Sequence, residues 1–285
     1  MNTSGRISPE REMDIAELAE EVADSHCPGS RVDPVKIVEA NDITLSFGRY
    51  ANAFDGLLEY QRGRFHIYSN LDRIEDPNAP RARFTLGHEL GHFCINEHRN
   101  ALKKGLAPSH PSFCEYTSDL LVEREADHFA SNLLMPRTRF MKAAKLTSRG
   151  LAGILSLAYT FGTSVTSTAI RYVKDEVEPC VVIKWQEGRF AWSWSSVEMQ
   201  KSRFRRPIVL PKRIPPGSPT ARALAGETTA ANYFSAGVRA SSWFPRVGVN
   251  EGGDLPLVEQ AMALGKFGIL TFLYPESNNY RSVRS

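Results

Sequence analysis

The stretch Gly87-His88-Glu89-Leu90-Gly91-His92 places two histidines four residues apart, with a glutamate directly after the first. On a helix, residues four apart lie on one face, so both imidazoles can reach a single ion. Glu89 lies beside them, where it can touch a water on that ion. A separate apolar face for core packing is formed by Leu86, Leu90 and Phe93. The motif predicts a metal-binding helix over about 80–97, and the alternative is a helix with two ordinary surface histidines.

A third metal ligand must come from elsewhere, because a catalytic zinc site has three protein ligands and one position for water. A second helix is predicted over about 115–134, and it offers Glu123, Glu125 and Asp127. Glu123 and Asp127 are four residues apart and share a face. This spacing predicts that Glu123 is a ligand while Asp127 holds the distal nitrogen of a histidine. The alternative is a solvated acidic face. The residues predicted to face the core are Val122, Ala126, Phe129 and Leu133.

Three further histidines, His98, His110 and His128, are rival ligands. His98 lies at or beyond the end of the first helix, and His110 lies in a loop flanked by prolines. For all three, a surface histidine with satisfied hydrogen bonds is the favoured interpretation. Tyr116 and His110 are the two candidates for a donor that stabilises an oxyanion.

The composition of the 285 residues is that of an ordinary globular protein, with 42% hydrophobic and 24% charged residues. It excludes collagen, low-complexity polymers and global disorder. The net charge of +3 is too small to imply nucleic-acid binding by itself. The four cysteines form no C-x-x-C pair, so no disulfide framework is expected. No apolar run approaches the ~18–20 residues of a membrane span, and the cytoplasm is the expected location.

Patterns along the chain indicate mixed helices and strands. Helices are expected over 9–24 and 33–40, strands over 43–47, 55–61 and 64–69, a connection over 98–114, and two short helices within 147–174. Arg62-Gly63 is predicted to form a hairpin turn. After residue 178 the runs 180–183, 189–196 and 268–274 predict strands.

Together, GHELGH (87–92) and EREADHFASNLLMP (123–136) resemble the ImmA/IrrE family of intracellular metallopeptidases. The resemblance covers about 40–175. It implies that His88, His92 and Glu123 are the metal ligands and that Glu89 is the catalytic acid. Position 127 is often asparagine in such proteins and is aspartate here.

The resulting expectation is an α+β protein with two domains. Residues 1–175 form a zincin-like, gluzincin-type catalytic domain whose tail, 147–175, is helix-turn-helix-like. Residues 178–285 form a smaller sheet-containing domain for regulation or substrate docking, for which the resemblance implies a GAF-like sensor.

The resemblance implies a zinc-dependent endopeptidase, with manganese as an alternative metal in cells. Its implied substrate is a helix-turn-helix transcriptional repressor, cleaved in a stress or mobile-element response. The alternatives are a non-catalytic, metal-stabilised regulator that binds a repressor or DNA through 147–213, and a toxin–antitoxin component. Direct nucleic-acid binding is not favoured, because the helix near 165–174 has a thin basic surface and the cations of 201–213 suit a solvated loop. No membrane association is expected, and the sequence specifies no oligomeric state.

Overall fold

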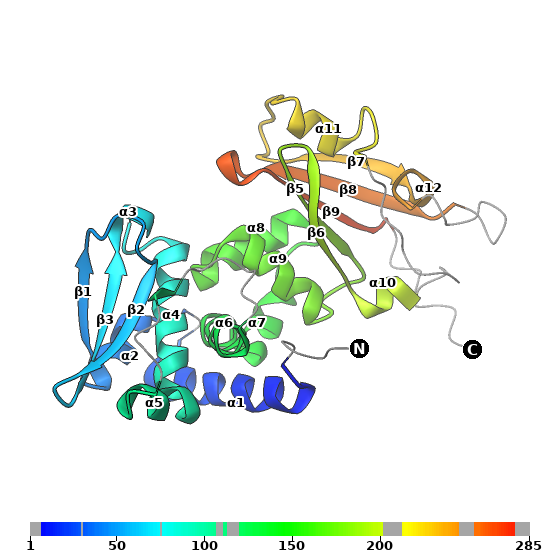
Figure 1. The fold of residues 1–285 in the computed structure, drawn as a ribbon. Helices are drawn as coiled ribbons and strands as arrows, with labels where there is room; N and C mark the ends of the chain where they lie inside the picture. The colour runs from blue at the N-terminus through cyan, green and yellow to red at the C-terminus, as the bar shows by residue number, and fades with distance from the viewer. Residues whose placement is uncertain are drawn as a thin grey trace, which may run out of the picture. The chain divides into compact units, whose positions relative to one another are not determined.

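The computed structural model describes residues 7–29, 31–74, 76–106, 111–112, 120–201, 213–244 and 254–276. The chain packs as two compact units, one of Met1–Ala143 with Leu157–Ser164 and the other of Ala144–Ser156 with Val165–Ser285. Helices and strands both contribute to the fold, which confirms the α+β class (Figure 1). None of the described helices combines the length and apolar character that a membrane crossing requires.

The first unit contains a small sheet and most of the helices. Its strands are β1 (Thr44–Gly48), β2 (Gly56–Gln61), β3 (Arg64–Asn70) and β4 (Pro111–Ser112). Its helices are α1 (Pro9–His26), α2 (Pro34–Ala40), α3 (Leu71–Ile74), α4 (Pro80–Cys94), α5 (Asn96–Lys103) and α6 (Leu121–Leu134), and α7 (Arg137–Ala144) ends at its border.

The sheet of the first unit has the order β1-β3-β2-β4, in which β1 pairs parallel to β3 and the other pairs are antiparallel. Arg62 and Gly63 connect β2 to β3 with φ of 51° and 84°, which confirms the predicted hairpin turn. α4 packs against β2 and β3, as Figure 1 shows. The helix and the sheet share one core that includes Leu58, Ile67 and Leu90.

The first of the two helices predicted to carry metal ligands is shorter than expected. α4 ends at Cys94, because Ile95 has an extended backbone (φ −70°, ψ 114°) that turns its side chain into the core. A separate helix, α5, then occupies 96–103, where a connection was expected. The prediction for 98–114 was therefore wrong over its first residues. The second helix, α6, begins at Leu121 rather than near 115.

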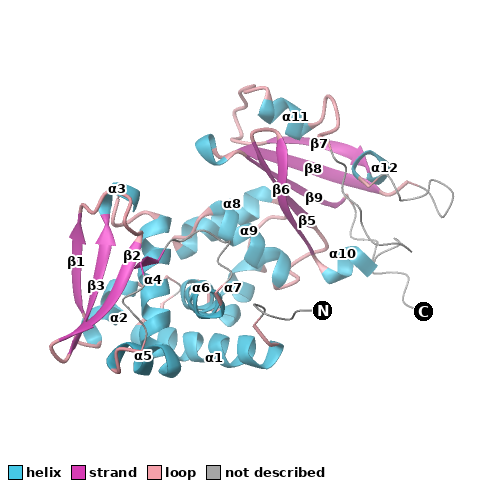
Figure 2. Ribbon diagram, viewed as in Figure 1, coloured by secondary structure: helices cyan, strands magenta, loops and turns pink. Residues whose placement is uncertain are grey.

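The second unit is built on a five-stranded antiparallel sheet with the order β6-β5-β9-β8-β7 (Figure 2). The strands are β5 (Val181–Gln186), β6 (Arg189–Ser195), β7 (Phe234–Arg239), β8 (Pro256–Ala263) and β9 (Ile269–Pro275). The helices are α9 (Val165–Lys174), α10 (Val197–Lys201), α11 (Pro219–Leu224) and α12 (Ala240–Trp243), and η1 is a 3-10 turn (Gly265–Phe267). The sequence predicted β5, β6 and β9 but not β7 and β8.

Every residue of β9 is buried because helices cover both of its faces. Tyr172 of α9 contacts Phe272 at a ring distance of 5.9 Å. Thr271 precedes Phe272 in β9, so its side chain points to the opposite face of the strand. There its hydroxyl forms a hydrogen bond with the hydroxyl of Thr220 in α11.

The helical tail is divided between the two units. α8 (Leu151–Phe161) crosses their border, and α9 belongs to the second unit. Gly162, with φ of 63°, ends α8 where the sequence predicted a break. The division into domains 1–175 and 178–285, the helix-turn-helix character of the tail and the GAF-like character of the sheet stay predictions.

Candidate metal centre

His88 and His92 lie one turn apart on α4, as the sequence predicted. Their Nε2 atoms are 3.1 Å apart, and their rings meet edge to face with centroids 4.8 Å apart. Both side chains are buried, and His88 is only 1% exposed. Burial of two imidazoles that aim the same nitrogen at one point is unusual unless something binds both, since buried polar groups need partners.

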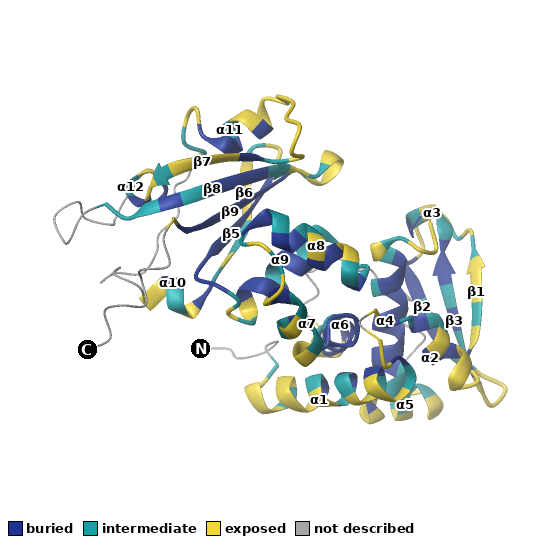
Figure 3. Ribbon diagram, turned by 180° about the vertical axis from the view of Figure 1, so that it is seen from behind, coloured by how far each residue is buried: buried dark blue, intermediate teal, exposed yellow. Residues whose placement is uncertain are grey.

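Direct packing of α4 on α6 brings the acidic residues of α6 to the histidines. A Cβ on Gly91 would lie 3.0 Å from the Ala126 Cα, and one on Gly87 would lie 3.3 Å from the Ala130 Cβ. These distances leave almost no room for a side chain at either glycine. The two glycines of α4 and the two alanines of α6 therefore allow the close approach of the helices. Both helices are strongly buried along this contact (Figure 3).

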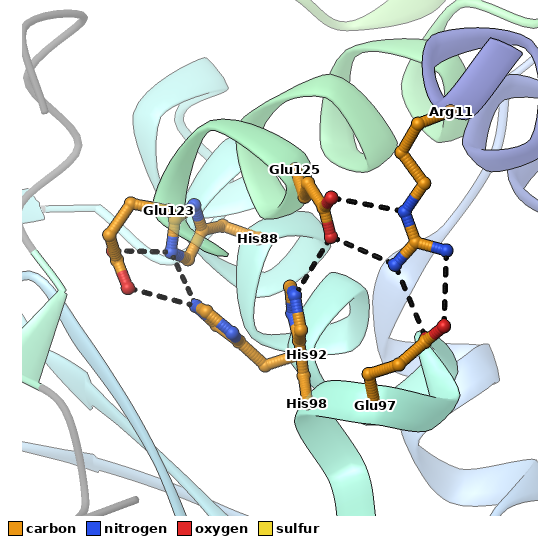
Figure 4. Close-up of polar contacts among 7 residues, drawn as sticks. All are labelled: Arg11, His88, His92, Glu97, His98, Glu123 and Glu125. Carbon is orange, nitrogen blue, oxygen red and sulfur yellow. Dashed lines mark hydrogen bonds and ion pairs between the residues drawn. The ribbon is translucent and has the colours of Figure 1, made fainter. Parts of the chain in front are cut away.

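Glu123 completes a three-residue cluster, as predicted. Its Oε2 lies 3.3 Å from Nε2 of His88 and its Oε1 lies 3.4 Å from Nε2 of His92 (Figure 4). Among the described residues, these three offer ligand atoms that all lie within 4.8 Å of one another. Glu123 lies in the first turn of α6, where the helix dipole favours a negative charge.

Asp127 occupies the position that the sequence predicted for it, beside the distal nitrogen of a histidine. Nδ1 of His88 donates to Oδ1 of Asp127 across 2.8 Å. This bond fixes a proton on Nδ1, so Nε2 is the nitrogen that faces the cluster and could bind a metal ion once it has lost its own proton. It also fixes the orientation of the ring, which is the usual function of a carboxylate behind a ligating histidine.

The cluster fits a metal ion by its donor atoms and its charge. Two imidazole nitrogens and one carboxylate are a common ligand set of catalytic zinc. Burial opposes the charge of Glu123, but contacts with His88 and His92 lower the pKa of its carboxyl well below the usual range. Oε1 of Glu123 is buried without a hydrogen bond among the described residues. A cation would satisfy this oxygen and both nitrogens at once, so His88, His92 and Glu123 could hold a metal ion.

Glu89 is fully buried next to the cluster, and neither of its oxygens makes a hydrogen bond to a described residue. Burial raises the pKa of its carboxyl to about 7, and the neighbouring His88 opposes this rise only in part. Gly56 of β2 allows this placement, because a Cβ there would lie 2.6 Å from Oε1 of Glu89. A carboxyl with a pKa near 7 can both accept and release a proton at neutral pH.

The prediction of a surface role was wrong for His98. This residue of α5 is 8% exposed, and its Nε2 donates to Oε2 of Glu125 across 3.0 Å. Arg11 of α1 binds the same carboxylate through two hydrogen bonds of 3.0 and 2.9 Å and also binds Glu97 (Figure 4). Arg11, Glu97, His98 and Glu125 are called the Arg11 cluster below. The ring of His98 lies 5.2 Å from that of His92, so the Arg11 cluster adjoins the metal centre.

The remaining candidates are not part of the cluster that the described residues form. His128 donates from Nε2 to the Glu12 carbonyl at 2.9 Å. His110 and Tyr116 lie outside the described residues. The predicted core stripe of α6 is correct for Ala126, Phe129 and Leu133 but wrong for Val122, which is 39% exposed. The first turn of α6 extends beyond the core, so its apolar residues reach the surface.

Comparison with known proteins finds a family model that matches part of the chain. Residues 75–172 match the peptidase M78 family, described as an IrrE N-terminal-like domain. Over these residues the chain is similar to an IrrE N-terminal-like domain. That segment contains α4 and α6, and with them the three metal-binding candidates together with Glu89 and Asp127. The resemblance seen in the two sequence motifs is thereby confirmed.

One solved structure similar to the chain is described as a transcriptional regulator of Mycobacterium tuberculosis. It is 11% identical, with a TM-score of 0.54 over 94% of this chain and 77% of the other. At this identity the likeness concerns the fold alone. No curated protein matches the chain.

Proposed function

We propose that this protein is a metal-dependent endopeptidase that cleaves a regulatory protein at a specific site. The observation that carries the proposal is the convergence of His88, His92 and Glu123 beside the buried carboxyl of Glu89. A peptidase of this type needs a Lewis acid beside a general base, and α4 carries two of the three candidate metal ligands together with Glu89. The IrrE N-terminal-like domain supports the same activity class.

His88, His92 and Glu123 would hold the ion, with zinc as the expected metal and manganese as the alternative in cells. When bound, zinc supplies a Lewis acid that polarises a substrate carbonyl and acidifies water. Asp127 keeps the His88 ring in the orientation that ligation requires. Glu89 takes the proton from the attacking water and passes it to the departing amine of the cleaved peptide bond.

The substrate is proposed to be a helix-turn-helix transcriptional repressor. The support is the family resemblance. A protease that acts on one regulatory protein must spare other proteins. We therefore expect this protein to cut casein far more slowly than a general protease does.

Binding of DNA through α9 is disfavoured by the contacts of its two cations. Arg171 is 8% exposed and pairs with Asp175 at 2.7 Å. Nζ of Lys174 lies 4.5 Å from the centre of the Trp194 ring. Most of the basic run 201–213 lies outside the described residues.

The Glu89→Gln variant tests the proposal, because it keeps the shape of the side chain and removes the base. Metal content by elemental mass spectrometry should equal that of wild type, while peptide cleavage should fall by about 10²–10⁴-fold. Mass spectrometry of new N-termini in a cell extract should find cuts in one or a few repressors with wild type only. A variant that cleaves at the wild-type rate would refute the role of Glu89. Wild-type protein that binds no metal would refute the whole proposal.

A further inference from the structure

A pocket of about 170 Å³ lies directly beside the metal centre. Glu89 and His92 line one part of it. The apolar residues that line it come from three elements: Leu58 of β2, Ala101 and Leu102 of α5, and Val122 of α6. Leu58 is 2% exposed whereas Val122 is 39% exposed, so the pocket runs from the protein surface to the core. Any side chain that enters it comes next to the proposed catalytic base.

Two of the polar residues that line this pocket, Glu97 and His98, are already paired within the Arg11 cluster. Glu97 accepts hydrogen bonds of 3.3 and 3.2 Å from Arg11. His98 donates to Glu125, which Arg11 also neutralises. Among the described residues that line the pocket, Glu89 is therefore the one carboxylate without an arginine or lysine partner. A lysine or arginine side chain would lose its hydration there and would compete with the catalytic use of Glu89.

The volume of the pocket limits the size of the side chain that can enter it. An apolar cavity of about 150 Å³ in another protein accommodates benzene. A pocket of about 170 Å³ therefore holds a leucine, methionine or phenylalanine side chain. Burial of an apolar side chain of this size favours its binding strongly enough to select one bond among many.

We propose that this pocket recognises an apolar side chain, of leucine to phenylalanine size, on the substrate residue next to the bond that is cut. Ala101 and Val122 set its size limit. This inference rests on the proposed function, because it names the substrate chemistry of the same site.

Cleavage of a matched peptide series tests the recognition. Starting from a peptide that wild type cuts, each residue next to the cut is replaced in turn by alanine, leucine, phenylalanine or lysine. At one of the two positions, leucine and phenylalanine should exceed alanine and lysine in kcat/KM by at least ~10-fold. Ala101→Leu should reduce kcat/KM for the phenylalanine peptide by a similar factor and should reduce that for the alanine peptide much less. Asn100→Leu adds the same side chain to the exposed neighbouring position of α5 and should change neither value.

A second measurement does not depend on cleavage. Toluene added to the metal-loaded protein should shift the NMR methyl signals of Leu58, Leu102 and Val122, and Ala101→Leu should abolish these shifts. If that variant does not fold, Val122→Phe fills the pocket from an exposed position and should have the same effect. Unchanged methyl signals in wild type, or equal cleavage of all four peptides at both positions, would overturn the inference. Toluene binding without any peptide cleavage would instead overturn the proposed function and support the apolar ligand class of the pocket.

Discussion

Two buried histidines of the first unit each bond a carboxylate of α6, yet their pKa values move in opposite directions. His88 donates to Asp127 across 2.8 Å and His98 donates to Glu125 across 3.0 Å. The pKa of His88 is raised to about 10, whereas that of His98 is lowered to about 4. Two hydrogen bonds of nearly equal length therefore belong to electrostatically opposite environments.

The charges around each pair explain the difference. Burial lowers the pKa of both imidazoles. At His88 this effect is outweighed by Asp127 and Glu123 on α6 and by Glu89. At His98 the charge of His92 and that of Arg11 add to the effect of burial, and Glu125 alone does not overcome them.

The comparison separates a candidate cation site from a network whose carboxylates already have a cationic partner. Among the described residues, no lysine or arginine pairs with Glu89, Glu123 or Asp127, so the metal centre holds negative charge that a bound cation can neutralise. In the Arg11 cluster, an arginine already pairs with both carboxylates. Glu123 and Glu125 are only two residues apart, so their positions in the sequence do not show that their electrostatic environments differ.

The largest expected effect is a loss of metal binding when Glu123 is substituted, with no such loss when Glu125 is substituted. Glu123→Gln removes a ligand, and its metal affinity should fall by more than the ~10–100-fold typical of residues behind the ligands. Glu125→Gln should retain the metal stoichiometry of wild type. Competition with a chelator followed by elemental mass spectrometry measures both. Equal loss of metal in the two variants would contradict the separation of the two networks.

Asp127→Asn should have an intermediate effect, because it weakens the partner of a ligand without removing the ligand. We expect metal affinity to fall by about 10–100-fold while the wild-type stoichiometry is still reached at saturating metal. The same competition assay gives the value. An affinity equal to that of wild type would show that the His88–Asp127 bond does not serve ligation.

Gly91→Ala tests how the two helices hold the metal centre together. The new methyl group would lie 3.0 Å from the Ala126 Cα, so α4 and α6 must separate. We expect a net loss of about 1–3 kcal/mol in the free energy of unfolding, reduced by the better helix propensity of alanine. Urea unfolding of the metal-free protein measures it. Gly237→Ala is the control, since a Cβ there has no neighbour within 4 Å. A more stable Gly91→Ala protein would contradict tight packing at this contact.

The arrangement of the candidate metal ligands could largely be predicted because it depends on local spacing. His88, Glu89 and His92 lie on one helix, and Glu123 and Asp127 lie on another, so helical periodicity alone places them. The Arg11 cluster could not be predicted in this way. Arg11 and Glu125 are 114 residues apart, and only tertiary packing brings them together.

The missed features of the fold have similar causes. The turn at Ile95 depends on burial of that side chain, because nothing in the neighbouring residues stops a helix there. β7 contains Gly237 and shows little alternation of buried and exposed residues, so its pairing with β8 is invisible in the pattern. The roles of Gly87 and Gly91 depend on Ala126 and Ala130 across the helix contact.

The smallest expected effect concerns Arg11. Its replacement by an uncharged residue would leave the carboxylates of the Arg11 cluster without a cationic partner, as in the candidate metal centre. Arg11→Met removes a positive charge that lowers the pKa of His98 and leaves Glu125 without its arginine. We expect the pKa of His98 in the metal-free protein to rise from about 4 by about one unit. NMR titration of the imidazole measures it, and Arg11→Lys, which keeps the charge, should give a smaller rise.

The sign of the stability change follows from the same shift. A histidine whose pKa is lower in the folded state than in the unfolded state binds its proton more readily after unfolding. His98 therefore reduces wild-type stability as the pH falls from about 6.5 towards about 4. In Arg11→Met this acid-induced loss should be smaller, even though the variant is less stable at pH 7 because a buried carboxylate has lost its partner. An unchanged pH dependence of urea unfolding would mean that burial and His92 alone, without Arg11, keep His98 neutral.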